Sequence, residues 1–132
     1  MKNLLFVLFF VTSLAASQLQ WTHNYTEALQ KASKSHKIVY VLISSRYCKW
    51  CRKFEQHTLE DKSVQKKLAS DFITVHLSRE DDNIPALFKT APVPRHYFVK
   101  ADGTVLYTAI GYRDVEMFEA FMEEAEHNKE NK

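Results

Sequence analysis

The sequence predicts one α/β domain in which helices flank a central mixed sheet of four strands. A continuous β-branched and aromatic run over 38–43 is typical of a central strand buried on both faces. Apolar residues at helical spacing precede and follow this run, which predicts parallel crossovers. A hairpin pattern over 97–107 then adds antiparallel strands. The expected order of elements is therefore α-β-α-β-α-β-β-α.

The first half of the chain is expected to hold a helix, a strand, a helix in two pieces and a second strand, over about 25–34, 38–43, 48–68 and 72–77. Asn24 and Glu27 have the spacing of a capping box, in which each residue satisfies an amide at the helix start. Asp61 is expected to cap the second helical piece.

The second half is expected to hold a short helix, a hairpin and a terminal helix, around 87–88, over 97–99 with 105–107, and from 115 onward. Asp102 and Gly103 supply the turn of the hairpin. The terminal helix has one apolar stripe and an opposite acidic face, which we interpret as solvated.

The composition indicates a single globular domain. The chain has 132 residues, of which 45% are apolar and 26% are charged, and this length suits one ordinary domain. Eighteen Lys and Arg residues against sixteen Asp and Glu residues give a net charge of +2. Because nucleic-acid-binding proteins carry a basic excess, no nucleic-acid partner is expected.

Residues 1–16 have the pattern of a secretory signal peptide. Lys2 precedes an apolar run over 4–11, and polar Thr12 and small residues follow it. The alternative, an uncleaved membrane anchor, is disfavoured because a spanning helix needs about 20 apolar residues. We therefore expect a signal peptide over 1–16, a mature domain over 17–132, and export, with a bacterial periplasm as the favoured compartment.

The two cysteines, Cys48 and Cys51, have C-x-x-C spacing at the expected start of a helix. Unpaired amides and the helix dipole favour negative charge there, which predicts a lowered pKa and a nucleophilic thiolate at Cys48. The positive charges around the pair are expected to lower the pKa of Cys48 further, and they are those of Arg46, Lys49 and Arg52. No acidic residue lies between Ser44 and Phe54 to offset them. Cys51, one turn further in, is the expected resolving thiol.

Other interpretations of the cysteine pair are weaker. A zinc site needs two further ligands, and His57 and His76 do not form a second closely spaced pair. A c-type haem attachment needs His where Arg52 stands. A purely structural disulfide is the main alternative, although so short a loop restrains the unfolded chain little. No metal or other cofactor is expected.

The strand over 38–43, the Cys-Lys-Trp-Cys helix start and a proline leading into the hairpin resemble the thioredoxin-fold family. The resemblance is greatest to exported thioredoxin-like thiol–disulfide oxidoreductases and covers about 21–126. It implies a thioredoxin-like fold and a cis proline facing the cysteine pair. The interval to the hairpin glycine, Gly103, assigns that proline to Pro94 rather than Pro92.

The resemblance also implies how substrate binds. Val93 and Pro94 are expected to offer a backbone edge to an extended peptide. Trp50, between the cysteines, and Tyr47, before the first, are the other expected substrate-binding residues. The family usually carries a buried Asp six residues before the first cysteine, and here that position is Leu42.

Together these features predict an exported enzyme that reduces protein disulfides, by attack of Cys48 and resolution by Cys51. The resemblance implies re-reduction by a membrane thiol transporter, and we expect a monomer. Two alternatives stay open: a disulfide donor or isomerase, and a non-catalytic binding module whose disulfide is structural.

Overall fold

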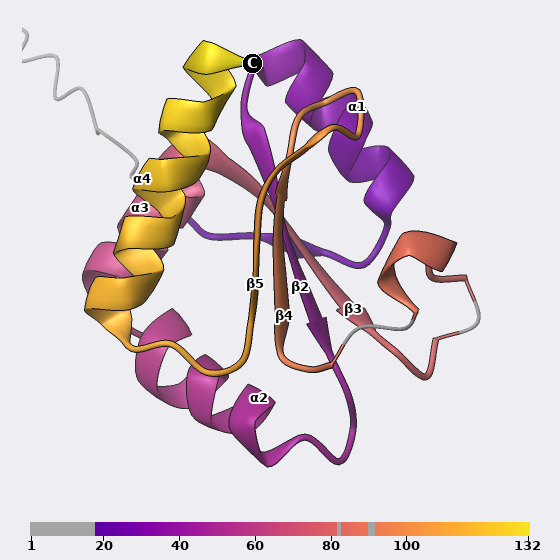
Figure 1. Ribbon diagram of the computed structural model, residues 1–132, viewed down its shortest axis with the longest axis vertical. Helices are drawn as coiled ribbons and strands as arrows, with labels where there is room; N and C mark the ends of the chain where they lie inside the picture. The colour runs from indigo at the N-terminus through magenta and orange to yellow at the C-terminus, as the bar shows by residue number, and fades with distance from the viewer. Residues whose placement is uncertain (1–17, 82, 90–91) are drawn as a thin grey trace, which may run out of the picture.

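A five-stranded mixed sheet in the order β1-β3-β2-β4-β5 forms the centre of the protein in the computed structural model (Figure 1). The strands are β1 (Trp21–Thr22), β2 (Ile38–Ser44), β3 (Phe72–Ser78), β4 (Arg95–Val99) and β5 (Val105–Ile110). Strands β1, β3 and β2 run parallel, whereas β4 pairs antiparallel with both β2 and β5. The α/β class, the crossovers and the hairpin are confirmed.

The structure describes residues 18–81, 83–89 and 92–132. The predicted signal peptide over 1–16 lies outside the described residues. Within the described part of the chain, no helix is long and apolar enough to cross a membrane.

The prediction of four strands was wrong by one, because β1 also joins the sheet. Trp21 pairs with Thr74 of β3, and the Thr74 hydroxyl donates to the Gln20 carbonyl at 2.7 Å. A strand of two residues is too short to show the alternation by which strands are recognised in a sequence.

Helices cover both faces of the sheet. They are α1 (Tyr25–Ser35), α2 (Lys49–Phe54), a π-helical segment η1 (Glu55–Leu59), α3 (Lys62–Asp71), a 3₁₀ turn η2 (Ala86–Phe88) and α4 (Val115–Asn131). Helices α2, α3 and α4 lie on one side of the sheet, and α1 and η2 lie on the other (Figure 1).

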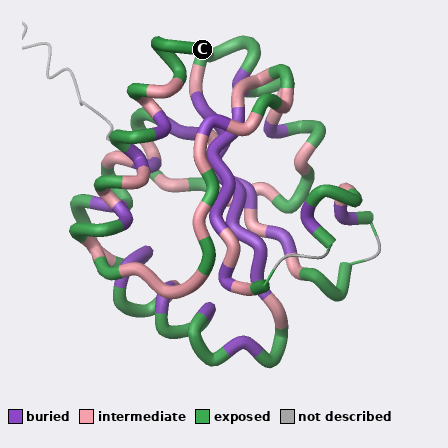
Figure 2. Tube along the Cα trace, in the orientation of Figure 1, coloured by how far each residue is buried: buried purple, intermediate pink, exposed green. Residues whose placement is uncertain are grey.

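Two apolar cores result, one on each face of the sheet. Tyr40, Leu42 and Phe98 pack with the helices α2, α3 and α4. Val41 and Val99, which point to the other face, pack with α1 and η2. All seven residues of β2 are buried, as the continuous apolar run predicts, and Figure 2 shows the buried strands running through the centre.

The predicted helix caps are largely confirmed. Asn24 Oδ1 accepts from the Glu27 amide at 3.1 Å, and Asp61 caps α3 by accepting from two amides. The Glu27 side chain does not complete a capping box but forms an ion pair with Lys31 at 2.5 Å. The Asn24 amide donates to Thr22 Oγ1 instead.

The acidic face of α4 is not solvated throughout, contrary to the sequence-based interpretation. Glu119 accepts from the Ser63 hydroxyl at 2.7 Å, and Glu126 pairs with Lys67 at 3.0 Å. These contacts join α4 to α3, a neighbour that helical periodicity alone does not identify.

Candidate active site

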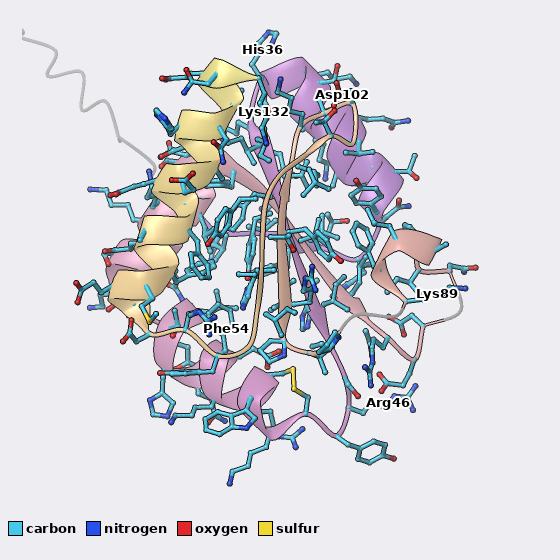
Figure 3. All side chains as sticks on the ribbon, viewed as in Figure 1. His36, Arg46, Phe54, Lys89, Asp102 and Lys132 are labelled. Carbon is cyan, nitrogen blue, oxygen red and sulfur yellow. A yellow bond between two sulfur atoms is a disulfide. The ribbon has the colours of Figure 1, made fainter. Side chains whose placement is uncertain are left out.

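The cysteine pair forms a disulfide at the start of α2, where the chain leaves the end of β2. The Sγ–Sγ distance is 2.07 Å, and Figure 3 shows this bond between the labelled residues Arg46 and Phe54. Cys48 is the N-cap of α2, and the Cys51 amide donates to Cys48 Sγ at 3.0 Å. The predicted position at a helix start is thus confirmed, and a helix amide points at the Cys48 sulfur.

The two cysteines differ in exposure. Cys48 is 9% exposed and Cys51 is 2% exposed. The outer sulfur is therefore the one that a partner reaches first, and the inner one lies against the core. This order agrees with the predicted roles of nucleophile and resolving thiol.

The Val93–Pro94 peptide bond is cis, as expected. Ile43 pairs with Arg95, so Pro94 lies level with the end of β2, from which the cysteine loop departs. The Pro94 carbonyl accepts from the Gly111 amide at 2.8 Å. Gly111 has φ +93°, a conformation that favours glycine, so the chain turn that holds the proline carbonyl depends on this residue type.

The two predicted aromatic binding residues are exposed beside the disulfide. Tyr47 is 89% exposed and Trp50 is 52% exposed. The Trp50 ring lies 6.1 Å from the Tyr112 ring, and Lys53 Nζ contacts both rings at 5.0 and 4.8 Å. Trp50 is thus held by cation–π contacts, whereas Tyr47 extends into solvent. The sequence did not indicate Tyr112, which comes from the connection between β5 and α4.

The cations around the cysteine pair differ in their contacts. Arg52 Nη1 donates to the Arg46 carbonyl at 2.8 Å and so braces the loop before Cys48. Lys49 and the side chain of Arg46 are exposed, as expected of groups that add positive charge to this end of the helix.

An acidic residue, Glu80, also reaches this loop from the end of β3. Its carboxylate accepts from the hydroxyls of Ser45 and Ser78, and from the Arg46 amide at 3.4 Å. These hydrogen bonds lower the pKa of Glu80 from 4.5 to about 2. Sequence reasoning missed Glu80 because it considered only acids close to the cysteines along the chain.

The Glu80→Gln variant is expected to be less stable than the wild type at neutral pH. Because folding lowers the Glu80 pKa from 4.5 to about 2, its stabilisation is complete above pH 4.5 and is lost as the pH falls toward 2. Thermal unfolding of both proteins across this range checks the expectation. The difference in Tm should shrink steadily below pH 4.5, and a constant difference would contradict it. Glu116→Gln, at an exposed acid on α4, should show no such difference.

Leu42, the residue six positions before Cys48, lies between two histidines in the sheet. It pairs with His76 on β3 and with His96 on β4. His96 is fully buried: Nδ1 contacts the Tyr40 hydroxyl at 2.8 Å and Nε2 contacts the Gly111 carbonyl at 2.9 Å. Burial lowers the pKa of His96 to about 4, so this ring is neutral at physiological pH.

His76 has a more polar and more open environment. Its Nε2 lies 2.6 Å from Ser44 Oγ and 3.5 Å from Glu55 Oε1. Burial lowers the pKa of His76, an effect that Glu55 opposes. Neither Glu55 nor the histidine pairing was predicted, since the contacts join residues far apart in the chain.

The mixed sheet, the oxidised C-x-x-C pair at the start of α2 and the cis proline beside it are the features of a thioredoxin fold with a dithiol–disulfide site. Residues 20–101 match the model of a family described as thioredoxin-like. Because the match covers more than half of the chain, the protein belongs to the thioredoxin-like family.

Solved structures agree with this fold. A DsbH oxidoreductase superposes with a TM-score of 0.68 at 20% identity, over 90% of this chain and 92% of that one. A thioredoxin from Thermus thermophilus gives a TM-score of 0.69 at 23% identity, over 83% of this chain and 86% of that one. At these identities the likeness concerns the fold.

A sequence relative is much longer than this chain. Spermatogenesis-associated protein 20 from Homo sapiens is 27% identical over 67 residues, which make up 51% of this chain and 8% of that protein. The chain therefore matches only a small part of this relative.

Proposed function

We propose that the protein is an exported thiol–disulfide oxidoreductase that reduces disulfides in other proteins. The observation that carries the proposal is the Cys48–Cys51 disulfide at the N-terminus of α2, with the Cys51 amide 3.0 Å from Cys48 Sγ. The pair closes and opens within one turn of helix, next to a peptide edge at Pro94.

In the reduced protein, Cys48 is the nucleophile. The Cys51 amide and the N-terminus of α2 stabilise its thiolate, and the exposed cations Arg46 and Lys49 add to this effect. The Cys48 thiolate attacks one sulfur of a substrate disulfide, forms a mixed disulfide and releases the other sulfur as a thiolate. Cys51 then attacks Cys48, which releases the second substrate thiol and oxidises the pair.

The substrate is an extended polypeptide segment in this proposal. The Val93–Pro94 edge lies beside the loop that leads to the cysteines, which supports strand-like pairing with a peptide. Trp50 and Tyr47, which flank Cys48 along the chain, provide exposed aromatic surface near the disulfide.

The remaining parts of the proposal come from the sequence. The pattern over 1–16 supports export, for which we favour a bacterial periplasm. In that compartment a membrane thiol transporter would supply the electrons, and the enzyme would act as a monomer. Cleavage at the end of 1–16 on expression, read by mass spectrometry of the mature protein, tests the export.

Equilibration of the Cys48/Cys51 couple with glutathione tests the direction of the reaction. A stabilised Cys48 thiolate favours the reduced protein, and hence a disulfide donor, so the measured potential decides between the roles. A potential near that of thioredoxin, about −270 mV, with catalysed reduction of a model protein disulfide, supports the reductase. A potential near −120 mV, roughly that of a strong oxidant, indicates a disulfide donor. A couple that does not exchange with glutathione indicates a binding module.

A further inference from the structure

In the proposed function, the resolving step requires a group that accepts the proton of the Cys51 thiol, and the inference below rests on that function. Cys51 attacks the mixed disulfide only as a thiolate, so its thiol must first lose a proton. Cys51 is 2% exposed as a residue, and this burial limits direct transfer of its proton to bulk water. Leu42, which pairs with His76 and His96 in the sheet, is apolar and cannot accept a proton.

Glu55 lies one turn below Cys51. Its amide donates to the Cys51 carbonyl, so the two residues occupy successive turns of the helix. Side chains four residues apart on a helix lie on the same face, with Cβ atoms about 5–6 Å apart. The carboxylate of Glu55 is therefore the acidic group that the helix itself brings to the inner cysteine.

His76 approaches the same place from the sheet. It pairs with Leu42 in the parallel ladder, and residues paired in this way point to the same face. Its Nε2 lies 3.5 Å from Glu55 Oε1. In the tautomer that carries its proton on Nδ1, the Nε2 lone pair accepts from the Ser44 hydroxyl. Once Nε2 is protonated, it can instead donate to the Glu55 carboxylate.

The other histidine next to Leu42 does not fit this role. Both ring nitrogens of His96 are engaged, by Tyr40 and by Gly111, and the ring is fully buried. Protonation would place a charge in the apolar core without a carboxylate partner. Of the two histidines that pair with Leu42, His76 is the one that has a carboxylate, that of Glu55, beside its ring.

A pocket connects the pair with solvent. A cavity of about 260 Å³ is lined by Glu55 and His76, together with Trp21, Leu59, Glu60 and Gln65. The side chains of His76 and Glu55 are 31% and 36% exposed. A proton that reaches the pair therefore has an exit to water through this pocket.

We propose that the Glu55–His76 pair accepts the proton of the Cys51 thiol during resolution. The Cys51 S–H bond breaks and its proton moves to the pair, directly or through one water in the pocket. The Cys51 thiolate then bonds to Cys48 Sγ, the bond from Cys48 to the substrate sulfur breaks, and the substrate leaves as a thiolate that takes a proton from solvent. The substrate gains two electrons and the cysteine pair loses two.

Charges around His76 agree with a group that takes up and releases a proton. Glu55 and Asp81 favour its charged form, whereas His23 and burial oppose that form. The pair is thus a neutral imidazole beside a carboxylate before the step, and an ion pair after it. The proton is thus held between His76 and Glu55, while the neighbouring Leu42 stays uncharged.

Stopped-flow reaction of the reduced protein with the aromatic disulfide DTNB separates the two steps. The first equivalent of coloured thiolate reports attack by Cys48, and the second reports resolution by Cys51. In Glu55→Gln and His76→Gln, the second phase should slow at least about tenfold below neutral pH, since a positioned base contributes 10²–10⁴-fold. The first phase should stay within about twofold of the wild type, because the variants leave the outer cysteine untouched.

The pH profile excludes a merely structural effect. The second phase of the wild type should level off above the pKa of the pair, whereas the variants should show a rate that rises in proportion to hydroxide. Glu60→Gln, which removes an acid lining the same pocket, is the matched control and should behave as the wild type.

Three results would overturn the inference: an unchanged second phase in both variants, an equal slowing in Glu60→Gln, or a variant profile that levels off like the wild type. If Glu55→Gln does not fold by circular dichroism, His76→Gln alone decides. Absence of the first phase in the wild type would instead overturn the proposed function, so the two failures are distinguishable.

Discussion

The Cys48→Ser variant is expected to lose disulfide reduction by more than roughly a thousandfold, because it lacks the covalent nucleophile. Cys51 cannot replace it, since this residue is buried and only 2% exposed. The measurement is the rate of reduction of a model protein disulfide, with glutathione supplying electrons. A serine differs from cysteine by one atom, so the fold should be retained.

Cys51→Ala is the matched variant, and it is expected to fail in a different way. Cys48 can still attack, but no thiol resolves the product, so the mixed disulfide accumulates. Non-reducing electrophoresis of the variant after contact with a disulfide-bonded protein should show a covalent complex that dithiothreitol releases. If Cys48→Ser keeps wild-type activity, or if Cys51→Ala traps nothing, the protein does not turn over disulfides and the binding-module alternative gains support.

The parts of the site that the sequence predicts are those that depend on residues close together along the chain. Apolar residues at helical spacing after the buried strand place a helix start near Cys48. The spacing of Cys48 and Cys51, about one helical turn, then puts both thiols on the same side of that helix. Pro94 was chosen over Pro92 because its interval to Gly103 in the hairpin resembles that of the thioredoxin-fold family. The structure confirms the close cysteine pair, the helix start and the cis bond.

The parts that the sequence did not predict depend on contacts between distant segments. Glu80 reaches the cysteine loop from the end of β3, and Tyr112 reaches Trp50 from the turn before α4. His76 meets Glu55 because the register of β3 against β2 puts His76 beside Leu42, on the face of the sheet that the helix of Glu55 covers. No periodicity or cap rule specifies such partners, since side-chain pairs across a sheet are set by register and not by local pattern.

Within the fold, the same division holds for single residues. The run over 38–43 correctly predicted a strand buried on both faces. His96, which pairs with Leu42 of this strand, is fully buried, although a histidine is usually found at the surface or partly buried. The structure explains the burial by the two hydrogen bonds to Tyr40 and Gly111, which satisfy both ring nitrogens.

The Phe54→Ala variant is expected to lower the free energy of unfolding by about 3–5 kcal/mol, the range measured for large aromatic side chains deleted from cores. Phe54 is 0% exposed, and its ring lies 4.8 Å from His96 and 5.1 Å from Phe118. The deletion leaves a cavity at the point where α2 rests on the sheet. Urea unfolding, followed by circular dichroism, measures the loss.

The effect should extend to the active site, because Phe54 is the buried residue that follows Cys51 on the inner face of α2. With this anchor removed, the helix start should open more often. Reduced Cys51 should then react faster with iodoacetamide, by roughly the factor by which the equilibrium constant for local opening rises. Phe54→Leu, which keeps most of the volume, should cost only about 1 kcal/mol and leave the alkylation rate near that of the wild type. Met117→Ala, at a half-exposed residue of α4, controls for a general loss of side-chain volume. If Phe54→Ala unfolds earlier in urea while Cys51 stays as protected as before, the helix is held in place by contacts other than its aromatic anchor.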